Sequence, residues 1–294
     1  MTLLELLPGS VLFAMMLAMG MGLAADDFRR VVAQPKAAVL GLAGQLVLLP
    51  AVAAGLVVWL PLSQSIAVGL LLIAACPGGS TSNAFSHLAR GDLALSISLT
   101  AVSSLLAFLW IPLVLGLALP LVDVGGAAPG PSLLETLRPV LLTTALPLVC
   151  GMALRRAAPD RAAAWRGPLL AGSIGVLLLL IAGLPMQLAA RSVDLPRIFA
   201  EATVPVLLLL TATMGVSLVA ARAAGIDARR ARTLAIEVGI QNFALAMLLA
   251  LTVLREPTYL ATGIVYLPCM LVFAAGMVWL GRREERTPAL ARSA

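Results

Sequence analysis

Residues 75–83 read ACPGGSTSN, and they interrupt an apolar run that extends from about residue 64 to residue 89. Pro77 has no backbone N–H and clashes with the preceding helical turn, and the two glycines after it do not favour continued helix. We therefore predict that a helix breaks within this stretch. The simpler alternative is a proline kink whose neighbouring hydroxyl groups bond to the backbone.

The rest of the chain has the composition of an integral membrane protein. Of its 294 residues 61% are hydrophobic and 12% charged, whereas soluble proteins have roughly 45–50% and about 25%. Apolar runs of about 18 or more residues predict nine transmembrane helices, at about 8–25, 37–60, 64–89, 92–119, 133–154, 168–190, 196–222, 230–254 and 257–281. We therefore expect one all-α membrane domain over residues 1–294, embedded in a lipid bilayer, with no separate soluble domain.

The basic residues predict how the helices are oriented. If the N-terminus is outside, only four of the 20 lysines and arginines face outward, namely Arg138, Arg191, Arg197 and Arg255. Because cytoplasmic loops are enriched in Lys and Arg, we predict an outside N-terminus and a cytoplasmic C-terminus. The first helix is expected to be a retained anchor, residues 282–294 a disordered cytoplasmic tail, and residues 123–132 a Gly/Pro turn. The net charge of +6 then reflects topology, so we expect no nucleic-acid partner.

A second interruption, EVGIQN at residues 237–242, holds the single carboxylate predicted to lie deep in the membrane. Each of the other 13 acidic residues lies in a loop or near a helix end. An ionisable group at this depth is costly unless it is paired, so Glu237 is a candidate for function; the alternative is a protonated glutamate bonded between helices. Gly78 and Gly239 mark matching positions in the two halves, which is typical of inverted-repeat transporters.

The polar groups near these interruptions suit a hard cation. Ser96 and Thr100 are four residues apart on one helical face, and Gln45 is an intramembrane amide. Carboxylate, amide and hydroxyl oxygens bind ions such as Na⁺, whereas zinc and copper need nitrogen or sulfur donors. The chain has one histidine, His87, to which we assign no role in coupling, and its three cysteines are expected to be buried free thiols: Cys76, Cys150 and Cys269.

These stretches resemble a known family. Residues 75–105, ACPGGSTSNAFSHLARGDLALSISLTAVSSL, resemble the signature region of the bile acid:sodium symporter family, and EVGIQN resembles its second signature. The resemblance extends to DDFRRV at 26–31 and GQLVLLP at 44–50, and it covers essentially the whole chain. It implies a bacterial-type, nine-span member in the inner membrane, with an inverted repeat of panel and core domains and two broken helices that cross in the core. The core would comprise about 64–119 and 196–281, and the panel part of 8–60 together with 133–190.

The resemblance also implies two Na⁺ sites and a substrate site. The first Na⁺ site would use Ser82, Asn83, Ser96, Thr100 and Glu237. The second would use Gln45, Glu237 and Gln241, with backbone carbonyls near Val238 and Ile240. The anionic group of the substrate would meet Gly79, Ser80 and Thr81 at a helix N-terminus, with Asn242 from the other break.

The predicted function is sodium-coupled symport of a small organic anion by alternating access, with about two Na⁺ per anion and no catalytic residues. Pantoate, 2-oxo acids and bile-acid-like steroids all remain open as substrates, and we expect a monomer. The nearest alternative is a proton-coupled or uniporting carrier on the same fold, because Glu237 could carry a proton. A receptor without transport and a channel are further alternatives. An intramembrane enzyme is a remote one, since no GxSxG motif occurs.

Overall fold

A computed structural model describes residues 3–122, 133–190 and 194–291 of the chain. Over these residues the secondary structure is helical, with no strand beyond one isolated bridge. Six described helices are long and apolar enough to cross a membrane, and three further apolar helices are shorter. The all-α fold is therefore confirmed, while the count of nine transmembrane helices stays a prediction. The Gly/Pro turn predicted at 123–132 lies outside the described residues.

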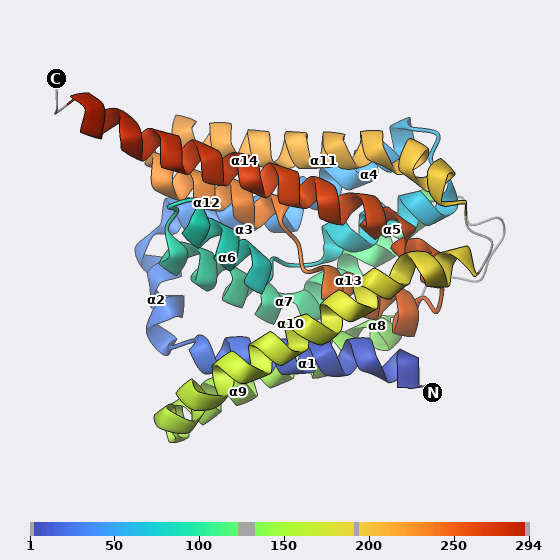
Figure 1. Cartoon of the computed structure of the whole chain (residues 1–294), viewed down its shortest axis with the longest axis horizontal. Coiled ribbons are helices and arrows are strands. Elements are labelled where there is room, and N and C mark those ends of the chain that lie inside the picture. The colour runs from blue at the N-terminus through green and yellow to red at the C-terminus, as the bar shows by residue number, and fades with distance from the viewer. Residues whose placement is uncertain (1–2, 123–132, 191–193, 292–294) are drawn as a thin grey trace.

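Figure 1 shows the order of the helices along the chain. The α-helices are α1 (Leu3–Gly22), α2 (Ala25–Ala33), α3 (Pro35–Ala43), α4 (Leu49–Trp59), α5 (Gln64–Ala75), α6 (Ser80–Leu88), α7 (Leu93–Ala118), α8 (Leu133–Val140), α9 (Leu146–Ala157), α10 (Pro159–Ala189), α11 (Leu195–Ala223), α12 (Ala228–Gly239), α13 (Phe243–Leu248) and α14 (Ala261–Ala291). There are three π-helical turns in the described residues: η1 (Gly44–Leu48) connects α3 to α4, η3 (Leu141–Ala145) connects α8 to α9, and η4 (Leu249–Val253) follows α13. Two 3₁₀ turns are η2 (Leu119–Leu121) and η5 (Pro257–Leu260).

Both predicted helix breaks are present. The first separates α5 from α6 at residues 76–79, and the second separates α12 from α13 at residues 240–242. Cys76 and Ile240, which follow α5 and α12, both have extended backbone. The backbone groups that the breaks release are therefore available to each other and to ligands.

The described helices form two groups. In the first, α1 packs against α9 and α10; in the second, α11 packs against α12 and α14, and α6 against α7 and α12. The groups meet where α1 contacts α13 and where α8 contacts α7, and Figure 1 shows α1, α9 and α10 along one side of the bundle. The helix from α3 to α4 contacts α5, α7, α11 and α12. The helix from α3 to α4 therefore lies in the second group. Within the range 8–60, part of which was predicted to belong to the panel, only α1 lies in the group with α9 and α10.

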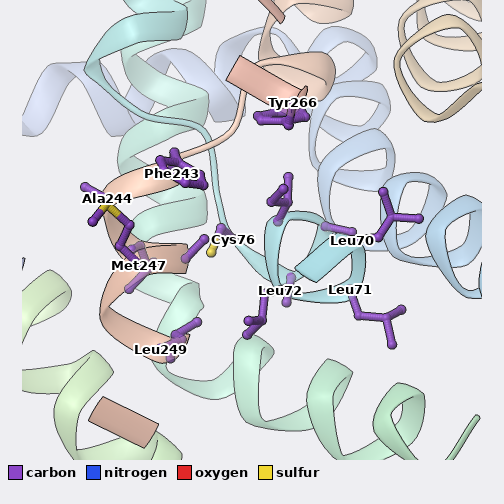
Figure 2. Close-up of a cluster of buried hydrophobic side chains, with 14 of the residues drawn as sticks. Leu70, Leu71, Leu72, Cys76, Phe243, Ala244, Met247, Leu249 and Tyr266 are labelled. Carbon is purple, nitrogen blue, oxygen red and sulfur yellow. The ribbon is translucent and has the colours of Figure 1, made fainter. Parts of the chain in front are cut away.

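Apolar side chains hold α5 against α13. Figure 2 shows Cys76 between Met247 and the turn that carries Leu70, Leu71 and Leu72. All of these side chains are buried, so the two half-helices form a tightly packed apolar unit beside the breaks.

The three cysteines differ in their surroundings. All are free, but Cys150 is exposed on the surface of α9 and Cys269 is partly exposed on α14. The expectation of three buried thiols is therefore right only for Cys76. Apolar sequence alone does not separate an inward-facing cysteine from one on the outer face of a membrane helix.

The connections predicted to be cytoplasmic lie at one end of the bundle. The α9–α10, α6–α7 and α11–α12 connections and the end of α14 all gather at the end where α2 lies (Figure 1). At this end α14 continues to Ala291, so the expected disordered tail is wrong for residues 282–291. Polar contacts hold α14 as far as Glu284, since Arg283 stacks on Trp279 at 5.2 Å and Glu284 bonds to arginines of α11 and α12.

Candidate functional site

The two breaks cross and bind each other through their backbones. Gly78 and Gln241 form an antiparallel bridge, and the Asn242 N–H donates to the Pro77 carbonyl at 2.9 Å. Both segments are extended, and an extended segment cannot satisfy its own N–H and C=O groups. The crossing is therefore fixed by hydrogen bonds that neither broken helix could make alone.

Tyr266 of α14 supports the second break. Its buried hydroxyl donates to the Gly239 carbonyl at 2.7 Å and accepts from the Gln241 N–H at 3.0 Å. A single side chain thus bridges the last residue of α12 and the middle of the break. We did not predict this role, and the available signal was a tyrosine inside the apolar run 257–281.

Glu237 lies at the centre of the crossing and is fully buried. Its Oε1 accepts a hydrogen bond from the Ser96 hydroxyl, and its Oε2 accepts from Thr100 Oγ1 at 2.8 Å and from Gln45 Nε2 at 3.1 Å. Among the described residues no lysine, arginine or histidine forms an ion pair with it. Within the described part of the chain, the carboxylate is thus surrounded by neutral polar groups and has no cationic partner.

Asn83 and Ser82 bring α6 to the same place. Asn83 Oδ1 accepts from Ser96 Oγ at 2.8 Å and from Thr100 Oγ1 at 3.3 Å, so it shares both hydroxyl groups with Glu237. Ser82 is fully buried, and its hydroxyl donates to the Gly79 carbonyl at 2.7 Å. The five side chains predicted for the first Na⁺ site therefore come from α6, α7 and α12, and four of them gather around the carboxylate of the fifth, Glu237.

Two buried amide oxygens at the crossing have no hydrogen-bond partner. Gln45 uses its Nε2 to bond the Glu237 carbonyl at 2.9 Å, and Gln241 uses its Nε2 to bond the Val238 carbonyl at 2.6 Å. Gln45 Oε1 and Gln241 Oε1 are left without a donor. A buried oxygen without a partner costs about 1–3 kcal/mol, and a bound cation would remove that cost. The Val238 carbonyl, predicted as a ligand, already accepts this Gln241 bond, while Ile240 is buried beside it.

Local structure explains why Gln45 reaches Glu237. Gln45 lies in the π-helical turn η1, and such turns often occur at functional sites because they displace a side chain from the regular helical register. Gly44 packs directly on Val238, where a β-carbon would collide with the valine side chain. The absence of a side chain at Gly44 lets α3 and the η1 turn approach α12 closely.

The start of α6 is suited to an anion. Gly79 precedes the helix without a side-chain cap, so the first N–H groups and the positive end of the helix dipole are available to a ligand. Ser80 is partly buried and Thr81 is exposed. Asn242 lies against Gly79, but its Oδ1 caps α13 by accepting from the Leu245 N–H at 3.2 Å. Asn242 therefore keeps its amide nitrogen as a donor for a ligand.

The site as a whole is a cluster of oxygen ligands around one buried carboxylate, next to an uncapped helix start. Hydroxyl, amide and carboxylate oxygens are ligands for Na⁺, and an uncapped helix start binds anions. His87 lies away from these groups, exposed in the last turn of α6. The geometry fits the joint binding of a cation and an anion.

Comparison with known proteins gives a consistent result. Residues 10–193 match the sodium bile acid symporter family. The chain is 30% identical over 274 residues, 91% of its length, to a rice protein described as probable sodium/metabolite cotransporter BASS2, chloroplastic. It is 43% identical over 100 residues, 34% of its length, to the uncharacterized sodium-dependent transporter YocS of Bacillus subtilis. It is also 30% identical over 178 residues, 60% of its length, to the ileal sodium/bile acid cotransporter of Cricetulus griseus.

The matched regions are only part of these relatives. They cover 62% of the rice protein, 31% of YocS and 49% of the ileal cotransporter. The chain thus spans less than two thirds of the length of each of them.

Proposed function

Because the chain belongs to the sodium bile acid symporter family, whose members are transporters rather than enzymes, we propose that it carries a small organic anion across a membrane together with Na⁺. The single observation that carries this proposal is the surrounding of Glu237. A fully buried carboxylate that forms no ion pair with a cationic side chain of the described residues is costly in a low-dielectric environment. A bound cation is the partner that its oxygen-rich neighbours favour.

Two cations can be accommodated around the same carboxylate. We assign the first Na⁺ to Ser82, Asn83, Ser96, Thr100 and Glu237, which is supported by the shared hydrogen bonds among them. We assign the second to Gln45, Glu237 and Gln241 with the carbonyls of Val238 and Ile240. The unpartnered Gln45 Oε1 and Gln241 Oε1 support this second assignment.

Charge balance supports the coupled transport of three ions. An ionised Glu237 with two Na⁺ and one monocarboxylate has no net charge, so the loaded protein can change conformation without burying an uncompensated charge. Each cycle would move one positive charge across the membrane, worth about 2.3 kcal/mol per 100 mV. Uptake of the anion is therefore expected to respond to the membrane potential as well as to the Na⁺ gradient.

The anion is proposed to bind at the start of α6. Gly79, Ser80 and Thr81 would supply backbone N–H groups, and Asn242 would add its amide nitrogen. The carboxylate of a small anion such as pantoate or a 2-oxo acid, or of a bile-acid-like steroid, would suit the N-terminal end of α6. The names of two relatives, one a probable sodium/metabolite cotransporter and one a sodium/bile acid cotransporter, support the same range.

We further propose that transport works by alternating access between the two groups of helices. The panel group would be α1 with α8 to α10, and the core group the remaining helices that carry the site. Their contacts, α1 with α13 and α7 with α8, form the surface along which they would move. The N-terminus would be outside, and the protein would be a monomer in the bacterial inner membrane.

A thermal-shift screen tests the function directly. Pantoate, 2-oxo acids and bile acids are each added to the purified protein in Na⁺ or in choline at fixed pH. We expect at least one anion to raise the melting temperature only when Na⁺ is present, because a ligand that binds the folded state stabilises it. Equal stabilisation in choline would instead favour the proton-coupled or uniport alternative.

Replacing Gln45 with leucine tests the second Na⁺ site. The change removes the unpartnered oxygen and the two hydrogen bonds to Glu237. We expect the Hill coefficient for Na⁺, which cannot exceed the number of sites, to fall from about two to about one in an uptake assay. Gln64→Leu is the matched control, because Gln64 is exposed and bonds Tyr259 outside the crossing. A Hill coefficient that stays near two in Gln45→Leu would contradict the assignment.

A further inference from the structure

The connection between α6 and α7, which we term the α6–α7 link (residues 89–92), is held by a buried arginine of α12. Arg232 Nε donates to the Ala89 carbonyl at 3.1 Å, and its Nη2 donates to the Arg90 carbonyl at 3.2 Å. Its Nη1 bonds to Glu284 of α14. All three nitrogens of the guanidinium group are therefore used, and they join α12 to the link and to α14.

Two further bonds attach the rest of the link to the same turn of α12. Arg229 Nε donates to the Gly91 carbonyl at 3.0 Å, and Thr233 Oγ1 accepts from the Asp92 N–H at 2.8 Å. Each of the four residues of the link is thus bonded through its backbone to α12.

The burial of Arg232 indicates that its contacts matter. Only 3% of the residue is exposed, and a buried charge is tolerated only when it is paired and its donors are satisfied. Glu284 is shared, since Arg222 of α11 also donates to it at 3.1 Å. Arg222 is more exposed, and among the described residues it has no hydrogen bond to the link, which makes it a natural control.

The backbone of the link is strained at Arg90. Arg90 has a φ of 55°, in the left-handed region that L-residues rarely adopt. The Gly91 N–H closes the turn by donating to the Ser86 carbonyl at 2.8 Å. At the end of α11 the corresponding position is Gly225, which takes a φ of 75° without steric cost. A strained residue persists only where its surroundings hold it, and here the bond from Arg232 to the Arg90 carbonyl does so.

The link also sets the geometry of the proposed Na⁺ site. It joins α6, which carries Asn83, to α7, which carries Ser96, and Glu237 lies five residues after Arg232 on α12. We propose that Arg232 is a positioning residue for Na⁺: it fixes the α6–α7 pair on α12 so that Asn83, Ser96 and Glu237 meet around the ion. This inference rests on the proposed Na⁺-coupled function.

The experiment uses Arg232→Met, which keeps a flexible unbranched apolar stem but removes every donor. Na⁺ binding is followed by thermal shift, and backbone hydrogen exchange is followed in peptides that cover residues 83–96. We expect the Na⁺ concentration for half-maximal stabilisation to rise at least about tenfold, equivalent to about 1.4 kcal/mol. Exchange of the Gly91 and Asp92 amides should become at least about fivefold faster, because their bonds open more often.

Arg232→Lys should have an intermediate effect, since it keeps the charge near Glu284 but cannot reproduce the planar fork. Arg222→Gln removes a partner of Glu284 without touching the link, and its Na⁺ affinity and exchange should stay within about twofold of the unmodified protein. If Arg232→Met does not fold, Arg232→Lys and Thr233→Val provide the test. Thr233→Val removes the acceptor of the Asp92 N–H at nearly constant volume.

The outcomes separate the two proposals. Unchanged exchange in residues 83–96 would overturn the role of Arg232 in holding the link. Faster exchange with unchanged Na⁺ affinity would overturn its role in positioning the Na⁺ site. A protein that is never stabilised by Na⁺, even without substitution, would overturn the proposed function, while the exchange measurement would still report whether Arg232 holds the link.

Discussion

Replacing Glu237 with glutamine is expected to abolish Na⁺-dependent uptake and Na⁺-dependent stabilisation. The carboxylate is the ligand shared by both proposed sites, and it accepts bonds from Ser96, Thr100 and Gln45. Removing one partner of a buried charge pair costs about 3–5 kcal/mol, and each 1.4 kcal/mol is about tenfold in affinity. The Na⁺ concentration needed for half-maximal effect should therefore rise by more than about a hundredfold.

The measurement is a Na⁺ titration of uptake into proteoliposomes, with a thermal-shift titration of the same protein. Glu201→Gln is the matched control, because Glu201 lies near the start of α11, where it pairs with the exposed Arg197 at 2.6 Å. A surface pair of this kind contributes about 0–1 kcal/mol, so this control should behave like the unmodified protein. Intact Na⁺-dependent uptake in Glu237→Gln would refute the assignment of both sites.

Replacing Gly78 with alanine is expected to block the second proposed Na⁺ site, because the added methyl group would occupy the space beside Glu237 and Gln45. A β-carbon at this position would lie 2.8 Å from Glu237 Oε2 and 3.1 Å from Gln45 Nε2, whereas non-bonded heavy atoms are in optimal contact at about 3.5–4.0 Å. The added methyl group would displace the carboxylate from its hydroxyl partners. We expect a loss of Na⁺ affinity of about ten- to a hundredfold, measured by the same titrations.

Gly215→Ala controls for a glycine substitution in the same group of helices. Gly215 lies inside α11 with no atom near its position for a β-carbon, so Na⁺ binding should not change. The melting temperature without Na⁺ separates a general packing defect from a local one, because overpacking of a core costs about 1–3 kcal/mol. If Gly78→Ala folds and binds Na⁺ with normal affinity, the ion does not lie between Glu237 and Gln45.

Much of the fold could be predicted from the sequence because the breaks are encoded locally. Pro77 and its two glycines end α5 in any tertiary context, and the polar run from Glu237 to Asn242 marks the end of α12. The expectation of a disordered tail was wrong because local sequence does not reveal the contacts of this segment with other helices. Residues 282–291 have no apolar run, and the part of the helix near Glu284 is held by contacts of that residue with arginines of α11 and α12, which lie far away in the sequence.

The candidate site divides in the same way. The residue types that could bind Na⁺ could be identified because polar side chains are rare in this apolar chain. Each polar side chain inside the bilayer costs free energy unless it has a partner, so its presence there points to a function. The hydrogen-bond partner of each polar atom could not be identified from the sequence. That Asn242 uses its oxygen to cap α13, and that Gln241 bonds the Val238 carbonyl, follows from the crossing of the breaks.

Tyr266 and Arg232 illustrate what sequence reasoning missed. A tyrosine in an apolar helix and an arginine near a predicted helix end have ordinary explanations, as a packing residue and as a topology signal. Only their distant partners, the Gly239 carbonyl and the α6–α7 link, reveal that each one holds a break or its neighbour in place.

The sequence by itself therefore determined the all-α membrane fold, the positions of both breaks and the kinds of ligand available, because burial cost and backbone chemistry act at each residue separately. The tertiary structure alone decided which helices pack together, which oxygens stay unpaired and which side chains fix the crossing. Those properties depend on contacts between separate helices, such as Tyr266 with Gly239 and Gln45 with Glu237, and these contacts exist only once the helices have packed.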